Sequence, residues 1–124
     1  MIRASCHCGA VTLSIPRAPE KVTQCDCSIC RRYGTLWGYF EQPEVQVEAR
    51  PDALREYAWG SKSLAFVRCA GCGCVTHWRP LAGRRSQRMG VNLRNFEPEQ
   101  IGPVRIRQLD GAVTEAFIGE YGPA

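Results

Sequence analysis

Eight cysteines in a chain of 124 residues limit the possible folds of this sequence more than any other feature. They occur in three clusters: Cys6 and Cys8; Cys25, Cys27 and Cys30; and Cys69, Cys72 and Cys74. The first residues, MIRASCHCGAVTLSI, contain no continuous apolar stretch like that of a secretion signal. We therefore expect a reducing compartment, the cytoplasm, where close cysteines bind metal more often than they form disulfides. Zinc suits tetrahedral thiolate sites best, and the alternatives are iron–sulfur clusters, redox disulfides and free thiols.

Length and composition predict a single folded domain over residues 1–124. Hydrophobic residues make up 44% of the chain and charged residues 23%, which is typical of globular proteins. A chain of this length is too short for two ordinary domains. No apolar run approaches the roughly 20 residues that a membrane helix needs, so we expect no membrane partner.

Glycines that directly follow one cysteine in each of two clusters divide the cysteines into two sites. A glycine follows Cys8 and Cys72 directly, but none follows Cys30. Glycine at such a position lets the backbone turn tightly beneath the sulfur atoms. This similarity predicts one closed structural zinc site with four thiolate ligands: Cys6, Cys8, Cys69 and Cys72. The second site would then have three protein ligands: Cys25, Cys27 and Cys30.

The position of Cys74 leaves two interpretations open. Spacing alone would also let Cys74 close the second site as its fourth ligand. In an extended segment, however, Cys72 and Cys74 face the same side, which would place Cys74 beside the first site. We therefore favour a small buried residue next to the structural zinc and keep the closing ligand as the alternative.

Alternating apolar segments separated by turn residues predict a mainly β fold. The expected strands cover residues 11–15, 35–40, 44–49, 54–59, 64–69, 75–78, 89–93 and 104–109. A short helix is expected over residues 28–34, with Ser28 near its start and Gly34 at its end. A helical turn is expected within residues 95–103.

Three segments, CHCG, CDCSICRRYGTLWGYF and YAWGSKSLAFVRCAGCG, together resemble the glutathione-dependent formaldehyde-activating enzyme family, or GFA-like proteins. The resemblance runs from about Ser5 to Asn95, and three cysteine clusters in this order are more specific than any single CxxC pair. It implies a mainly β, zinc-braced Mss4-like (β-tent) domain with two zinc ions. The first ion would be structural, and the fourth position of the second would be open to the thiol of glutathione.

A zinc ion with three protein ligands and one exchangeable position is typical of catalytic sites. A thiol that entered this position would lose its proton and become nucleophilic. Its addition to an aldehyde would give a hemithioacetal, which is S-(hydroxymethyl)glutathione when the partners are glutathione and formaldehyde. We therefore expect a carbon–sulfur lyase with Cys25, Cys27 and Cys30 as its catalytic residues. The alternatives are a non-catalytic zinc-binding interaction module of the same fold and a redox switch.

Arginines provide the expected contacts to the substrate. Glutathione has two carboxylates, and Arg31 and Arg32 directly follow the third ligand of the second site, so we expect these two to bind it. A second basic stretch is expected to be solvated surface: Arg79, Arg84, Arg85 and Arg88. The net charge of +4 would fall to about +1 with two zinc ions on seven thiolates. We therefore expect no nucleic-acid partner.

The remaining polar and aromatic candidates have competing interpretations. His77 is either a proton carrier, a ligand of the second site or a buried strand histidine, and we favour the last. His7 is expected to point away from the metal. Asp26 is either an acid or base near the site or an exposed loop carboxylate. The larger aromatic residues are expected in the core or in pocket walls: Tyr33, Trp37, Tyr39, Trp59 and Trp78.

Overall fold

The alternating segments of the sequence form strands in the computed structural model, which describes residues 1–60, 63–82 and 86–122. The elements in chain order are β1 (Ile2–Ser5), β2 (Val11–Ile15), β3 (Lys21–Cys25), α1 (Ser28–Tyr33), β4 (Trp37–Glu41), η1 (Gln42–Glu44), β5 (Gln46–Ala49), η2 (Pro51–Ala53), β6 (Leu54–Tyr57), β7 (Leu64–Cys69), β8 (Val75–Pro80), β9 (Arg88–Asn92), η3 (Leu93–Asn95), α2 (Pro98–Ile101), β10 (Arg105–Asp110) and β11 (Ala116–Tyr121). The predicted mainly β class with short helices is confirmed and agrees with the Mss4-like fold.

The smaller of two sheets is built around β2. Val11, Leu13 and Ile15 are fully buried because alternate residues of a strand face the same side. β1 and β5 pair with opposite edges of β2 in antiparallel register, so the sheet order is β1-β2-β5. The small sheet therefore has one apolar face available for packing.

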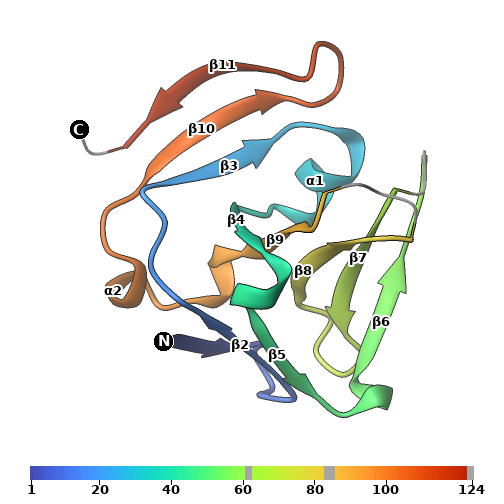
Figure 1. The fold of residues 1–124 in the computed structure, drawn as a ribbon. Helices are drawn as coiled ribbons and strands as arrows, with labels where there is room; N and C mark the ends of the chain where they lie inside the picture. The colour runs from blue at the N-terminus through green and yellow to red at the C-terminus, as the bar shows by residue number, and fades with distance from the viewer. Residues whose placement is uncertain (61–62, 83–85, 123–124) are drawn as a thin grey trace.

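The larger sheet has the order β11-β10-β3-β4-β9-β8-β7-β6 (Figure 1). Its neighbouring strands are antiparallel except for β3 and β10, which run parallel, with Cys25 opposite Leu109. This pairing places the turn between β10 and β11 beside the end of β3. A segment near the C-terminus thereby reaches the CDCSIC motif.

Two buried clusters connect these elements. Leu13 and Ile15 of the small sheet pack with Phe40 and Val91 of the large sheet, so the main core lies between the sheets. A second cluster contains Trp37, Phe66 and Trp78, and the side chains of α1 pack against it. Cys30 belongs to this second cluster and is therefore a buried thiol.

Most predicted elements agree with the structure to within a few residues. β7 has the predicted bounds, and α1 ends at Gly34, whose φ of 66° is the left-handed conformation that favours glycine at a helix end. Three strands, β1, β3 and β11, were not expected from the sequence. β11 is an edge strand whose side chains are mostly exposed, so it lacks the apolar alternation that identifies a buried strand. Among the residues that the structure describes, no helix has the length and apolarity to cross a membrane.

Candidate metal centres

The CDCSIC segment brings three thiols together at the junction of β3 and α1. Cys25 ends β3, Cys27 caps the N-terminus of α1 and Cys30 lies within the helix. Their Sγ atoms lie within 4.8 Å of one another, and no fourth Cys, His, Asp or Glu of the described residues joins this group. We call these residues the cysteine triad. The expected three-ligand set is thus gathered in one place.

Hydrogen bonds to the triad sulfurs favour negative charge on them. The backbone N–H of Cys27 donates to Cys25 Sγ at 3.5 Å, and that of Cys30 donates to Cys27 Sγ at 3.4 Å. The indole N–H of Trp37 donates to Cys30 Sγ at 3.4 Å from the buried side. Donors arranged in this way stabilise thiolates, which are the form of cysteine that binds metal.

The three thiols also affect one another's protonation. A hydrogen bond from Cys30 lowers the pKa of Cys25 to about 6. The same hydrogen bond, together with burial, raises the pKa of Cys30. The lowered pKa favours the thiolate form of Cys25 near neutral pH. Thiolates are soft ligands, and a set of three sulfur donors fits zinc.

The turn between β10 and β11 closes against the triad. A Cβ atom added at Gly111 would collide with Cys25 Sγ and would lie 3.2 Å from Cys27 Cβ. The backbone N–H of Asp26 donates to the Leu109 carbonyl at 3.1 Å. The Asp26 carboxylate in turn accepts the N–H of Ala112 at 3.2 Å. Asp26 is thus an exposed carboxylate that ties this turn to the triad.

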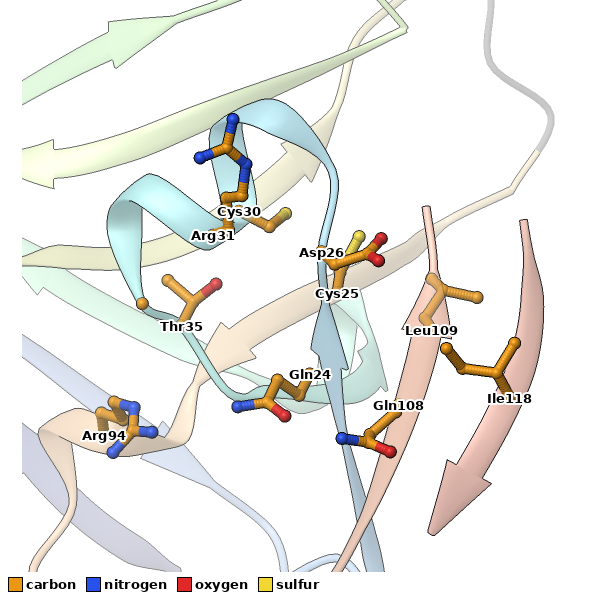
Figure 2. Close-up of a pocket in the computed structure, with 11 residues that line it drawn as sticks. Gln24, Cys25, Asp26, Cys30, Arg31, Thr35, Arg94, Gln108, Leu109 and Ile118 are labelled. Carbon is orange, nitrogen blue, oxygen red and sulfur yellow. The ribbon is translucent and has the colours of Figure 1, made fainter. Parts of the chain in front are cut away.

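A pocket of about 240 Å³ lies beside the triad (Figure 2). We call it the polar pocket, and the lining residues that matter most here are Gln24, Cys25, Cys30, Thr35, Arg94 and Gln108. Figure 2 shows Thr35 and Gln24 between Arg94 and the two cysteines. A molecule in this pocket would therefore touch sulfur at one end and a guanidinium group at the other.

A second pocket, of about 360 Å³, adjoins Cys25 and Cys27. Its walls include the side chains of Ile29, Leu64 and Phe66, so we call it the apolar pocket. Cys25 lines both pockets, so both of them border the triad.

The two arginines expected to bind substrate lie in different places. Arg31 lines the polar pocket, although Figure 2 shows its guanidinium extending away from Thr35 and Gln24. Arg32 does not line that pocket; it borders a shallow one with Trp59, and its Nη1 donates to the Ser28 carbonyl at 2.7 Å. The two arginines therefore do not border the same pocket.

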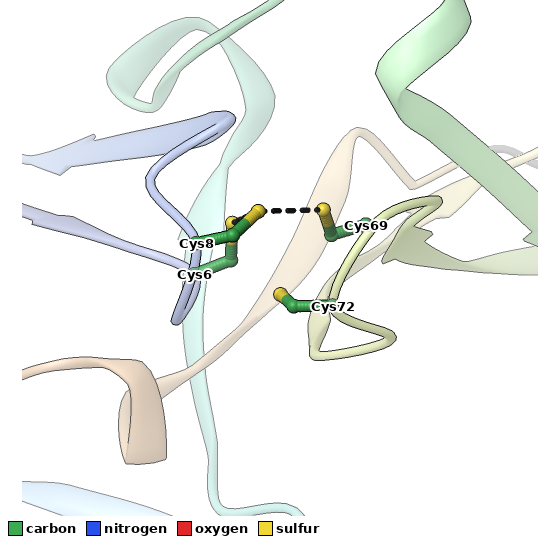
Figure 3. Close-up of side chains that lie close together, drawn as sticks. All are labelled: Cys6, Cys8, Cys69 and Cys72. Atoms are coloured by element: carbon green, nitrogen blue, oxygen red, sulfur yellow. Dashed lines mark hydrogen bonds between the residues drawn. The ribbon is translucent and has the colours of Figure 1, made fainter.

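The second group of cysteines joins the two sheets (Figure 3). Cys6 and Cys8 come from the turn between β1 and β2, whereas Cys69 ends β7 and Cys72 lies in the turn between β7 and β8. The Sγ of Cys8 lies 3.7 Å from that of Cys6 and 3.6 Å from that of Cys69. These distances match the edge of about 3.8 Å in a tetrahedron with Zn–S bonds of about 2.3 Å, and they are far longer than a disulfide bond.

The two turns that hold these four cysteines have the same local geometry. Gly9 has a φ of 84° and its N–H donates to the Cys6 carbonyl at 3.1 Å. Gly73 has a φ of 79° and its N–H donates to the Cys69 carbonyl at 3.0 Å. The predicted pair of matching turns with glycine is therefore confirmed, because a φ in this range is disfavoured for other residues.

Backbone donors also point at the sulfurs of this four-cysteine group. The N–H of Val11 donates to Cys6 Sγ at 3.4 Å, and the N–H of Gly71 donates to Cys69 Sγ at 3.3 Å. Hydrogen bonds from the backbone of Cys74 and of Cys8 lower the pKa of Cys72 to about 5. The group therefore fits a bound zinc ion in both distance and charge.

Cys74 lies beside the four-cysteine group and belongs to neither set of sulfurs. Its backbone carbonyl accepts the N–H of Cys69 at 3.0 Å, and its side chain packs against the cluster of Cys6 and Val11. The favoured interpretation of Cys74 as a small buried residue next to the first site agrees with this position, although its side chain is half-buried rather than fully buried.

Among the described residues, the other candidates from the sequence contribute no ligand atom to either cysteine group. His77 is 5% exposed, shares a 2.9 Å hydrogen bond with the Thr76 hydroxyl, and has its pKa lowered to about 4 by burial. It is the buried strand histidine that we favoured. His7 is exposed. Of the second basic stretch, Arg79 pairs with Glu56 at 2.7 Å and Arg88 lies over Tyr39, whereas Arg84 and Arg85 fall outside the described residues.

One family model matches most of the chain. The family model described as "Glutathione-dependent formaldehyde-activating enzyme" matches residues 1–107. The chain belongs to this family. No curated protein matches it. A crystal structure of a Rhodobacter sphaeroides protein is similar, with a TM-score of 0.68 and 28% sequence identity over 82% of this chain and 96% of that one.

Three residues that surround the triad were not predicted from the sequence to belong to the site. Trp37 was expected only in the core or a pocket wall, and Gly111 and Arg94 were not singled out. Asp110 and Gly111 form an Asp-Gly pair, which is a turn signal, but it does not reveal which element the turn contacts. Arg94 has no distinguishing sequence signal.

Proposed function

We propose that this protein is a zinc-dependent carbon–sulfur lyase that joins a small thiol, such as glutathione, to an aldehyde such as formaldehyde. The observation that carries the proposal is the cysteine triad: three sulfurs within 4.8 Å of one another, with two pockets that meet at Cys25. A set of three protein ligands beside a pocket is typical of catalytic zinc, whereas structural zinc has four. Membership of the family supports the same assignment.

The proposal assigns one zinc ion to each cysteine group. The four-cysteine group would hold a structural ion, because its ligands link turns of two different sheets. Cys25, Cys27 and Cys30 would hold the catalytic ion. Zinc at the triad would supply activation of a thiol by lowering its pKa. All eight cysteines are free thiols, which fits the reducing cytoplasm that we propose as the compartment.

The residues around the triad would bind and orient the two reactants. The N–H groups of Trp37 and of the backbone keep negative charge on the triad sulfurs. The polar pocket would admit the thiol and the apolar pocket the aldehyde. In the overall reaction the thiol sulfur bonds to the carbonyl carbon, the carbonyl π bond breaks, and the thiol proton ends on the oxygen. No oxidant or further reactant is needed, and holding both molecules together provides the rate increase.

Glutathione and formaldehyde also combine without a catalyst, so the test must measure a rate rather than the presence of product. Exchange spectroscopy measures such a rate. We would measure the rate of S-(hydroxymethyl)glutathione formation by ¹³C exchange NMR with the zinc-loaded protein. The protein should accelerate exchange, and Cys27→Ser should abolish the acceleration. Cys74→Ser is the matched control, because it removes a thiol that lies outside the triad. No acceleration by the wild type with any small thiol and aldehyde would favour the non-catalytic interaction module instead.

A further inference from the structure

We propose that the polar pocket recognises the carboxylate of a short, acid-bearing thiol, and that Arg94 is the residue that binds it. The inference rests on the proposed function, because it names the substrate class of the same site. It differs from the sequence prediction, which placed this role on Arg31 and Arg32.

Arg94 has a charge that no residue in the described part of the chain neutralises. The ion pairs of the described residues involve Lys21 and other arginines, and no side-chain hydrogen bond of Arg94 is present among those residues. Arg79 and Arg105, by contrast, each pair with a glutamate. An unpaired guanidinium at the wall of a pocket is suited to a carboxylate, which it can bind through two parallel hydrogen bonds.

A buried amide holds the backbone of Arg94 in place. Asn92 is 7% exposed, and its Oδ1 accepts the N–H of both Arg94 (3.3 Å) and Leu36 (3.2 Å). Its Nδ2 donates to the Val75 carbonyl at 2.8 Å. The same amide therefore ties Arg94 to the segment that carries Thr35. The base of the guanidinium arm is preorganised, which reduces the entropy lost on binding.

Polar side chains line the pocket between Arg94 and the triad. Thr35 is 3% exposed, and its Oγ1 is buried without a hydrogen-bond partner in the described part of the chain. A buried hydroxyl in this state is costly, and a ligand with a polar atom in the pocket would relieve it. The amide groups of Gln24 and Gln108 provide further donors. Asp26, which carries the carboxylate that lines the pocket, lies beside Cys25 and away from Arg94, and this carboxylate accepts the N–H of Ala112.

The size of the pocket limits the ligand. A volume of about 240 Å³ corresponds to roughly eight water molecules at ~30 Å³ each. It is below the range of about 300–1,000 Å³ that encloses drug-sized ligands. The enclosed part of the substrate is therefore a thiol, a short carbon chain and one carboxylate. A larger thiol such as glutathione would extend from the pocket into solvent.

Two thiols with the same carbon chain, one ending in a carboxylate and the other in its uncharged methyl ester, provide the test. We would titrate 3-mercaptopropionate and its methyl ester into the zinc-loaded protein by calorimetry, and into the cobalt-substituted protein by sulfur-to-metal absorption. The acid should bind about tenfold more tightly than the ester, as expected for one charge-assisted contact. Arg94→Gln should reduce this ratio to about one. Arg32→Gln, the matched control with the same change in charge, should leave the ratio unchanged.

The possible outcomes distinguish a failure of the proposed carboxylate site from a failure of the proposed function. Equal binding of acid and ester to the wild type would overturn the carboxylate site but leave thiol binding at the triad. Equal losses in Arg94→Gln and Arg32→Gln would also overturn it, because they would indicate general electrostatic attraction. Binding of neither thiol, with no change in cobalt absorption, would overturn the proposed function and this inference together.

Discussion

At the scale of single residues, the indole of Trp37 contacts the most buried sulfur of the triad, that of Cys30. Trp37 is 2% exposed, and its N–H donates to Cys30 Sγ at 3.4 Å. Groups that hydrogen-bond to a metal ligand orient it and tune its charge, and their loss typically lowers metal affinity about 10–100-fold. Within the described part of the chain, Trp37 is the one side chain whose N–H donates to the buried sulfur of Cys30.

We therefore expect Trp37→Phe to weaken zinc binding at the triad about 10–100-fold without affecting the four-cysteine group. Competition with a chelator would measure the two affinities separately. Trp78→Phe is the matched control, because it makes the same change in volume within the same buried cluster. If both variants weakened the triad equally, packing rather than the hydrogen bond would be responsible.

At the scale of elements, the β10–β11 hairpin completes the environment of the triad from the C-terminal part of the chain. The parallel pairing of β3 and β10 places Leu109 opposite Cys25, and Gly111 then follows against its sulfur. The turn itself is stabilised by Asp110, whose carboxylate accepts the N–H groups of Val113 and Thr114 at 3.3 Å. The contact thus has a defined backbone geometry that leaves no room for a side chain at Gly111.

Gly111→Ala should therefore displace Cys25 and reduce the bound zinc from two ions to one per chain, while the protein remains folded. Metal analysis after dialysis, combined with circular dichroism, would measure this. Gly119→Ala in the same hairpin is the control. A Cβ there would meet the end of the flexible Gln108 side chain at 2.9 Å, which can move away. Two zinc ions bound to Gly111→Ala would show that the hairpin contact does not position Cys25.

At the scale of the whole molecule, the four-cysteine group connects the two sheets. Cys6 and Cys8 follow β1 of the small sheet, whereas Cys69 ends β7 of the large sheet. A structural zinc site contributes about 10–16 kcal/mol to folding in small zinc domains, and a domain is stable by only about 5–15 kcal/mol. A zinc ion held by the four-cysteine group, as proposed, would thus contribute as much free energy as the whole stability of such a domain.

We accordingly expect Cys69→Ser to abolish cooperative thermal unfolding, since the loss would be comparable to the whole stability of the domain. Cys27→Ser should keep a cooperative transition, because the triad lies within one short segment that connects β3 to α1. Thermal melts followed by near-ultraviolet circular dichroism would distinguish the two variants. A collapse of Cys27→Ser like that of Cys69→Ser would identify the triad as a second structural site.

The sequence by itself determined the features that depend on neighbouring residues. The division of seven cysteines into four and three, the left-handed glycines at 9 and 73, the bounds of β7 and the end of α1 at Gly34 all agree with the structure. Each follows from side-chain spacing or from a backbone conformation that favours glycine, and these are properties of a few consecutive residues. The three missed strands have weak local patterns and depend on their partners.

Only the tertiary structure decided what surrounds the triad. Gly111 contacts Cys25, and Arg94 lies near Thr35, because of the order of strands in the large sheet. The same order separates Cys74 from the triad and places it beside the four-cysteine group. Strand order results from burial and pairing summed over the whole chain, so no short stretch of sequence encodes it. The two cysteine groups could therefore be predicted from spacing, whereas the pocket beside the triad could not.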